Sequence, residues 1–440
     1  MADVSSDRFD ADAARRTIFV ALAIAAMAAS FVLVKTGRDA LYFMERGLFD
    51  LPKAYIAIAA ASVPFAFGTL RLMRLLGPRA ARVVAPIGAA VLFGLATTIV
   101  TPGGGVFNTT LFVIIPLTYG VLFSLAWLLA ADLLDGRSND VLGAAYGRIG
   151  AGAIVGGVGG GVLAKALAHA VIPQVLMGLG LALLVVAALI MLSAQTRYEA
   201  RALTTPRRVR DAARASGGVL GVLRHRYAML LLVVAMAASL TGIFVEFQFY
   251  LAASVNHQSS AENASFFASF YIVLNLGALA VQIVVMPRVQ KWLGVHGSLL
   301  IMPVAILGTG VFMIGNASLL VRSGLKATEG GLKASIHRSN WEQAYLPLSK
   351  EQRAAAKLVI DGAAARLAEG VAAGALYVWL VMAVGEGTLR GQSTAWLTYS
   401  MLVTASTWIG LTWVLRELAR KEVGEMDAGE RRVDLPVPDT

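Results

Sequence analysis

The chain has 440 residues, of which 57% are hydrophobic and only 15% are charged. A water-soluble globule of this size could not cover its surface with so few polar side chains, so most of its outer surface is expected to contact lipid. In hydrocarbon only helices and closed barrels satisfy their own backbone groups, and the long apolar runs exclude the short alternating strands of a barrel. The composition therefore predicts an all-α, polytopic membrane protein.

Charge and residue usage narrow the class further. The net charge is +11, there is no cysteine, and the five histidines are scattered along the chain. Disulfides and thiolate sites are excluded, so we expect no metal and no cofactor. Basic residues on cytoplasmic loops account for the positive charge, so no nucleic-acid partner is expected.

The predicted elements are roughly twelve apolar stretches, each long enough to cross about 30 Å of hydrocarbon at about 1.5 Å per residue. In chain order they lie near residues 16–44, 52–75, 80–101, 106–134, 141–169, 172–194, 227–253, 262–287, 293–315, 317–345, 351–383 and 394–416.

A basic segment separates two sets of six spans. We predict an N-terminal six-helix half at 1–195, a cytoplasmic linker at 196–226, a C-terminal six-helix half at 227–420 and a cytoplasmic tail at 421–440. This is the arrangement of major-facilitator transporters. A weak internal repeat agrees with it, because Ala26-Met27-Ala28-Ala29-Ser30 recurs as Ala235-Met236-Ala237-Ala238-Ser239.

Loop charges predict the orientation. The loops after the second, fourth, sixth and eighth spans are rich in arginine and lysine, whereas 101–108 and 256–263 carry almost none. The polar start of the chain has no clean cleavage site, which is typical of a cytoplasmic tail and not of a signal peptide. We therefore expect a multi-pass protein of a bacterial-type inner membrane with both termini in the cytoplasm.

Charged residues inside the predicted spans are the most informative feature, because a charge near the bilayer centre is costly unless it faces a water-filled cavity or a partner. In the first span Lys35, Arg38, Asp39 and Tyr42 share one helix face. In the seventh span Glu246 lies close to Gln248 and Tyr250, and in the eighth Tyr271, Asn275 and Gln282 form another stripe.

The tenth and eleventh spans carry more charges. Arg322, Lys326, Glu329 and Lys333 recur along one face of the tenth span. Lys357 and Asp361 open the eleventh span at a spacing that allows an ion pair, and Arg366 and Glu369 follow.

Cations outnumber acids among these residues, which favours a small anionic solute, plausibly a phosphorylated one. The candidate substrate-binding residues are Lys35, Arg38, Tyr42, Lys326, Lys333 and Lys357, and the candidate coupling or gating acids are Asp39, Glu246, Glu329 and Asp361. Two alternatives stay open. The charges could only pair with each other to latch the halves together, and Asp39, Glu246 or Asp361 could carry a proton.

The glycine-rich stretch at 143–161 resembles a nucleotide-binding loop only superficially. It follows an apolar helix and lacks the Lys-Ser/Thr of a P-loop, so close helix packing by small residues is the better interpretation. No arrangement of residues typical of catalysis is found, and we do not expect an enzyme.

Four segments resemble the nucleotide transporter (ATP/ADP carrier protein) family and its bacterial major-facilitator-like relatives. They are KTGRDALY at 35–42, SLAWLLAADLLDGRSNDVLGAAYGRIGAGAIVGG at 124–157, VEFQFY at 245–250 and LKASIHRSNWEQAYLPLSKEQRAAAKLVIDGAAARL at 332–367. The resemblance implies that Lys35, Glu246, Lys333 and Lys357 match charged positions used for nucleotide recognition and exchange. One departure is that carriers of adenine nucleotides have an acid in the fourth span, where this chain has Ser124.

We therefore predict a secondary transporter that moves a small anion, such as a nucleotide or another phosphorylated or carboxylated metabolite, by alternating access. Antiport and proton symport both fit. The alternatives are a non-transporting scaffold or assembly protein that keeps the fold, and a transporter of a lipid-linked anion.

Overall fold

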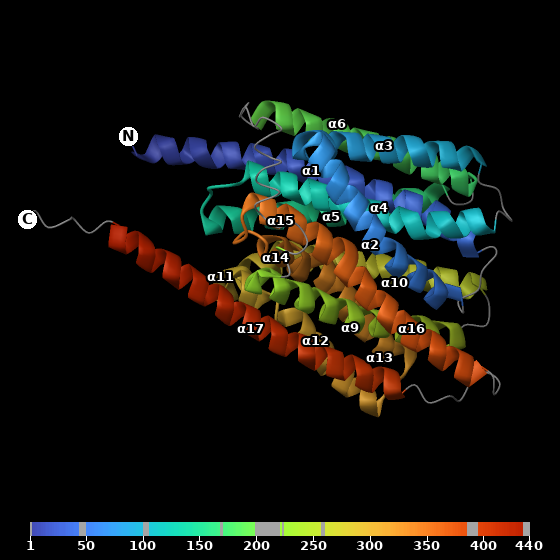
Figure 1. The fold of residues 1–440 in the computed structure, drawn as a ribbon. Coiled ribbons are helices and arrows are strands. Elements are labelled where there is room, and N and C mark those ends of the chain that lie inside the picture. The colour runs from blue at the N-terminus through green and yellow to red at the C-terminus, as the bar shows by residue number, and fades with distance from the viewer. Residues whose placement is uncertain are drawn as a thin grey trace, which may run out of the picture.

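The structure is a computed structural model that describes the backbone of residues 2–43, 50–99, 105–167, 170–198, 221, 224–256, 260–384 and 395–433. Within these residues every regular element is helical, as an apolar chain in hydrocarbon requires. The helices lie side by side along one direction (Figure 1). Nine of them are long and apolar enough to cross a bilayer, counted in the described part of the chain.

The N-terminal half consists of six continuous helices. They are α1 (Ala2–Phe43), α2 (Leu51–Leu76), α3 (Pro78–Ile99), α4 (Val106–Leu133), α5 (Asn139–Leu167) and α6 (Pro173–Tyr198).

The C-terminal half makes six further passes, three of which contain a π-helical turn. The first two passes are α9 (Arg226–Asn256) and a run of α10 (Ser260–Ala280), η2 (Val281–Val285) and α11 (Met286–Ser298). Gly294 breaks α11 with a φ of 69°, and the third pass, α12 (Ile301–Gly315), follows. The fourth pass consists of α13 (Leu319–Leu332), η3 (Lys333–His337) and α14 (Arg338–Gln343). The fifth consists of α15 (Lys350–Lys357), η4 (Leu358–Ala364) and α16 (Ala365–Val384). The sixth is α17 (Ala395–Val433).

These passes confirm the predicted all-α fold with twelve spans in two sets of six. The exact boundaries of the predicted halves stay predictions, and residues 199–220 of the predicted linker and 434–440 of the predicted tail lie outside the described residues. Helix α1 starts well before the predicted first span, and α17 continues into the predicted tail.

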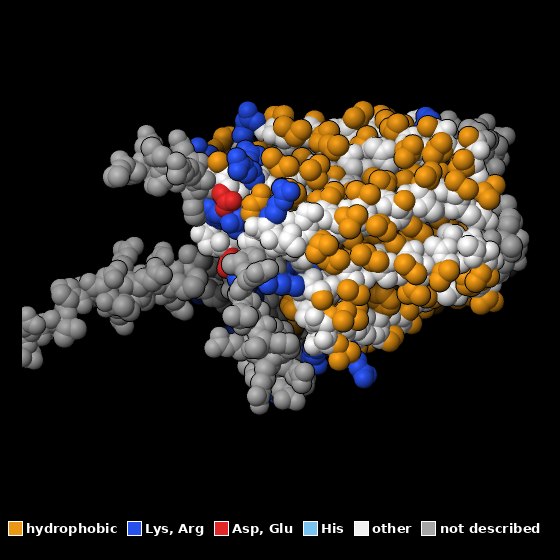
Figure 2. Space-filling model, turned by 90° about the horizontal axis from the view of Figure 1, so that it is seen from above, with side chains coloured by type: hydrophobic (Ala, Val, Ile, Leu, Met, Phe, Trp, Pro, Cys, Tyr) orange, Lys and Arg blue, Asp and Glu red, His pale blue; other side chains and the backbone are white. Residues whose placement is uncertain are grey.

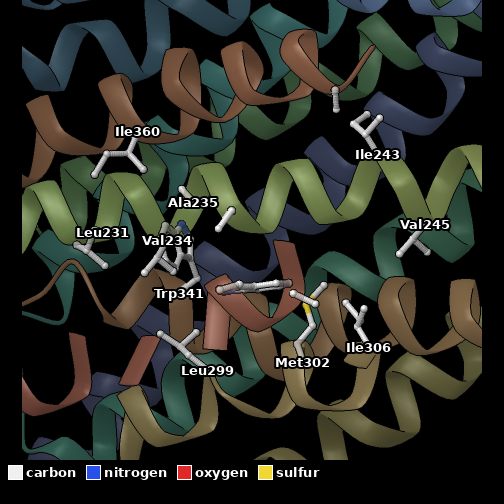
Figure 3. Close-up of a cluster of buried hydrophobic side chains, with 14 of the residues drawn as sticks. Leu231, Val234, Ala235, Ile243, Val245, Leu299, Met302, Ile306, Trp341 and Ile360 are labelled. Atoms are coloured by element: carbon white, nitrogen blue, oxygen red, sulfur yellow. The ribbon is translucent and has the colours of Figure 1, made fainter. Parts of the chain in front are cut away.

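The largest hydrophobic cluster of each half is built from that half's own residues, and a smaller cluster joins Leu358 of η4 to α2, α3 and α4. In the C-terminal half, α9 lies at the centre and packs against α13, α16 and α17. Its Leu231 and Val234 belong to one buried cluster with Met302 of α12 and Trp341 of α14 (Figure 3). In the N-terminal half, α1 packs against α4, α5 and α6. Each half can therefore move as a packed unit.

Side-chain types divide the outer surface as a membrane protein requires. In Figure 2 a broad hydrophobic face covers most of the visible molecule, and lysine and arginine side chains gather at one end. The start of α1 and the end of α17 lie at that same end (Figure 1). Both described ends of the chain are therefore on one side of the membrane.

Candidate functional site

A chain of polar contacts, which we call the Glu246 network, links the two halves. It consists of Tyr55 on α2, Glu246 on α9, Lys326 and Glu329 on α13, and Lys333 at the start of η3. The Tyr55 hydroxyl donates to Glu246 Oε1 over 3.4 Å, and Lys326 Nζ lies 3.7 Å from Glu246 Oε2. Lys326 Nζ is 2.8 Å from Glu329, whose other oxygen is 3.3 Å from Lys333 Nζ.

The members of this network differ in their exposure. Glu329 is 1% exposed and Lys326 is 9% exposed, but the side chains of Glu246 and Lys333 are 30% and 60% exposed. Lys333 lies midway along the pass formed by α13, η3 and α14, where a lysine that faced lipid would be costly. We therefore infer that its exposed surface faces the interior of the protein and not lipid.

Glu246 also borders a small hollow between the halves. Leu51, Pro52 and Tyr55 of α2 form one wall, and residues of α9 and α16, including Phe247 and Leu376, form the other. The polar atoms of the hollow are turned away from its surface, so its lining is apolar. An ionic network and an apolar hollow thus lie side by side at the boundary between the halves.

A second set of charges, which we call the Lys357 network, is enclosed in the C-terminal half. Lys357 pairs with Glu342 and lies 3.3 Å from Asp361. Arg338 lies 2.7 Å from the other oxygen of Glu342. Lys357 and Glu342 are each 2% exposed, so a solute cannot reach this ammonium group in the present conformation.

Neutral donors complete the Lys357 network. Trp341 Nε1 and the Tyr345 hydroxyl donate to Asp361 Oδ1 over 3.0 and 2.9 Å. The two acids are thus matched by two cations and two further donors, which offsets the cost of burying their charges. This arrangement is suited to holding α14 against α15 and η4.

The turn between α14 and α15 positions the second network. Arg353 donates to the carbonyls of Tyr345, Leu346 and Leu348, and Ser349 with Gln352 forms a capping box at the start of α15. These bonds satisfy backbone groups that the chain leaves open where it reverses direction. The turn thereby places the Tyr345 ring beside the ammonium group of Lys357, with 5.0 Å between the nitrogen and the ring centroid.

The predicted stripe on α1 forms a third group. Lys35 Nζ is 3.4 Å from Asp39, and Arg38 Nε donates to Asp39 over 2.8 Å. The Arg38 guanidinium lies over the Phe112 ring, 4.2 Å from its centroid. The Tyr42 ring stacks on the same Phe112 ring, with 4.0 Å between the centroids. Lys35 is half exposed, whereas Arg38 is buried.

Several polar contacts join the halves near the end where the chain starts and finishes. Gln282 Nε2 in η2 donates to the Gly147 carbonyl of α5 over 2.9 Å and to Ser339 over 3.0 Å. Lys350 Nζ is 3.0 Å from Asp135, and Arg338 lies over the Trp127 ring at 5.7 Å. The halves are therefore in contact along this end of their boundary.

Comparison with the sequence predictions gives a mixed result. The structure pairs Glu329 with Lys326 and Lys333, and Lys357 with Asp361, as their spacing suggested. It also brings Glu246 of α9 to Lys326, which no spacing indicated. Gln248, which we expected beside Glu246, instead accepts a hydrogen bond from Thr398 on α17.

Sequence reasoning missed Tyr55 and Glu342. Tyr55 lies in an apolar span of the other half, and no sequence pattern connects it to Glu246. Glu342 could have been found, because it is an acid in the most polar span, inside the segment that carries the strongest family resemblance.

Metal ligation finds no support in the described residues, among which no three histidine, aspartate or glutamate side chains are placed to hold an ion. The Glu246 network instead offers the ammonium group of Lys333, whose side chain is 60% exposed. Such groups bind anions by charge and by hydrogen bonding.

Comparison with known proteins shows the fold. No family model matches the chain, and no curated protein matches it in sequence. The crystal structure of the human organic anion transporter MFSD10 (TETRAN) superposes with a TM-score of 0.63 at 14% identity and covers 91% of this chain and 98% of that one. A bacterial homologue of the iron transporter ferroportin, in its outward-facing state, gives 0.64 at 14% identity, covering 91% of this chain and 99% of that one. The chain therefore has the fold of major-facilitator-type transporters.

Proposed function

We propose that the protein is a secondary transporter that carries a small anionic solute across the membrane by alternating access. The observation that supports this most is Lys333, an ammonium group that is 60% exposed halfway along a membrane-crossing pass. A charge at that depth is stable only next to water or counter-charge, and an internal hydrated cation attracts an anion. The major-facilitator fold supports the transport mode.

The cationic surface also bears on the choice between the substrates of the two similar structures. One of those proteins is described as an organic anion transporter and the other as a homologue of an iron transporter. Lys333 and Lys35, both at least half exposed, would repel a metal cation. For this chain we favour the anion.

Within this proposal the residues have different roles. Lys333 and Lys35 make the first contact with the solute, while Arg38, Tyr42, Lys326 and Lys357 support the site from buried positions. Asp39, Glu246, Glu329 and Asp361 balance these cations and couple binding to the movement of the halves. A nucleotide, exchanged or carried with a proton, is the solute that the family resemblance favours. The predicted inner-membrane orientation, with cytoplasmic termini, belongs to the same proposal.

The test is uptake into proteoliposomes that contain the purified protein. Labelled ATP, ADP and smaller phosphorylated and carboxylated anions would be offered, with unlabelled nucleotide or a proton gradient inside the vesicles. We expect saturable uptake of at least one anion, and a loss of at least about tenfold in Lys333→Gln, because one charged contact to a solute is worth about 1.5–3 kcal/mol.

Two controls separate the site from the fold. Lys333→Arg keeps the charge and should keep most of the uptake, and Lys291→Gln removes an exposed lysine of α11 and should transport normally. All variants should melt near the temperature of the parent. Uptake of no anion by the parent protein would contradict the proposal and favour a scaffold role, and uptake of only lipid-linked anions would favour that alternative.

A further inference from the structure

Lys326 has two acidic partners, and they are held unequally. Glu329 lies 2.8 Å from its ammonium nitrogen and is almost completely buried, whereas Glu246 lies 3.7 Å away and is 30% exposed. The second contact of Glu246, with the Tyr55 hydroxyl, is also long at 3.4 Å. Glu246 is therefore the acid that can leave the network without opening the core.

Lys333, at the start of η3, brings a second cation close to the face of α9 that carries Glu246. Gly242 and Glu246 are four residues apart and share one face of that helix. A Cβ atom at Gly242 would lie 3.6 Å from Glu329 Oε1 and 3.9 Å from Lys333 Nζ. The ammonium groups of Lys326 and Lys333 thus flank Glu329 along this face, and the Glu246 carboxylate lies at one end of it.

Charge balance determines what can replace Glu246. The network holds two lysines and two glutamates, so it is neutral as it stands. If the Glu246 carboxylate turns away, the two lysines and Glu329 keep a net positive charge in a region of low dielectric, which attracts one anionic group.

We propose that the Glu246 carboxylate is an internal counter-anion that occupies the place of the solute. The anionic group of the solute, a carboxylate or phosphate, takes the place of the Glu246 carboxylate beside Lys326 and also contacts Lys333. This inference rests on the proposed transport of an anion and identifies the subsite that binds the charged group.

Tyr55 couples the replacement of Glu246 by the solute to the position of the N-terminal half. It belongs to the N-terminal half and lies within electrostatic reach of Arg38 on α1 and of Arg366 and Glu369 on α16. On the other sides of Glu246 are Lys326 on α13, and Tyr250, whose hydroxyl contacts Tyr271 on α10. A carboxylate displaced from Lys326 keeps its contact with Tyr55 of the N-terminal half, while Arg38 and Arg366 stay paired with Asp39 and Glu369. This contact holds the two halves together around the bound solute.

The first consequence is kinetic. Glu246→Gln removes the competing charge, so the solute should bind more tightly, with a KM about fivefold lower, the worth of one partly exposed ion pair. The maximal rate should fall, because nothing returns to Lys326 to expel the solute. Glu246→Asp keeps the charge and should restore both parameters toward those of the parent. A purely structural role would lower the rate without lowering KM.

The second experiment needs no transport at all. The chain contains no cysteine, so Glu246→Cys introduces a single thiol. The purified protein would be treated with an anionic and a cationic methanethiosulfonate of similar size, and each rate would be divided by that of free cysteine. We expect the anionic reagent to be favoured by at least about fivefold, and the preference to disappear when Lys333→Gln is added.

The outcomes separate the two proposals. A preference for the anionic reagent that depends on Lys333 supports the subsite even if no solute is transported. Equal rates, or a preference for the cationic reagent, would overturn the inference even if anion uptake is found. Glu246→Gln with an unchanged or higher KM would overturn it as well.

Discussion

The two halves pack their helices in different ways. In the N-terminal half, glycines of α5 and α6 bring backbone directly against backbone: a Cβ atom on Gly152, Gly160 or Gly180 would meet the main chain of α1 within 3 Å. Within the C-terminal half, Gly310 and Gly330 approach the ends of side chains, those of Met401 and Leu274, although Gly370 lies tightly against Ala59 of the other half. The first kind of contact cannot yield, whereas the second can.

The same division holds for helix geometry and for charge. The described helices α1 to α6 contain no π-helical turn, while η2, η3 and η4 interrupt three passes of the C-terminal half. Lys333 and Asp361 lie in these turns, and π turns within helices often occur at functional sites. From this comparison we expect the N-terminal half to be the more rigid of the two and the C-terminal half to be the one that adjusts.

The largest expected effect comes from the buried Lys357 network. Lys357→Gln leaves Glu342 and Asp361 without their shared cation and should lower the free energy of unfolding by about 3–5 kcal/mol. Lys35→Gln, in the N-terminal half, removes a half-exposed lysine and should cost less than about 1 kcal/mol. Thermal unfolding of the purified variants in detergent measures both. Equal losses would remove the distinction between enclosed and accessible lysines.

The next effect tests backbone packing. A Cβ on Gly156 would overlap main-chain atoms of Ala25, so Gly156→Ala should destabilise the protein by about 1–3 kcal/mol. Gly157→Ala is the matched control, because no heavy atom outside its own helix lies within 4 Å. Gly310→Ala in the C-terminal half should cost less than Gly156→Ala, since the Met401 side chain can move aside. If Gly310→Ala proved the more harmful, the rigid body would be the other half.

A smaller effect is expected where the halves meet. Gln282→Leu removes the hydrogen bonds to Gly147 and Ser339, which are worth about 1 kcal/mol. The equilibrium between conformations should shift about fivefold toward separation of α5 from η2. Spin labels on α5 and α11 would report this as a second, longer distance. An unchanged distance distribution would show that this contact does not hold the halves together.

The smallest effect concerns the ion pair between Lys350 and Asp135. Both side chains are about half exposed, so Lys350→Ala should change stability by less than about 1 kcal/mol. Any change in uptake rate should vanish at about 1 M salt, where the Debye length is about 3 Å. A salt-independent effect would mean that Lys350 acts by something other than its charge.

The helix positions could be predicted because hydrophobic runs of fixed length depend only on local sequence. The ion pairs within α13 and between Lys357 and Asp361 could also be predicted, since residues three or four apart on a helix are neighbours. The contact of Tyr55 with Glu246 depends on how two distant helices pack, which no local pattern encodes. The π turns were missed for a similar reason, because the sequence from Lys333 to His337 has no composition that separates it from α-helix.

The π turns place the two networks in register with each other. A π turn contains one residue more than the α-helical turn it replaces, and one residue in an α-helix corresponds to about 100° of rotation. Removing a single residue between Lys333 and His337 would therefore rotate Trp341 and Glu342 away from Lys357 and Asp361, although every residue of the two networks would still be present in the chain. The protein would keep nearly its whole composition and lose the alignment between its accessible and its enclosed charges.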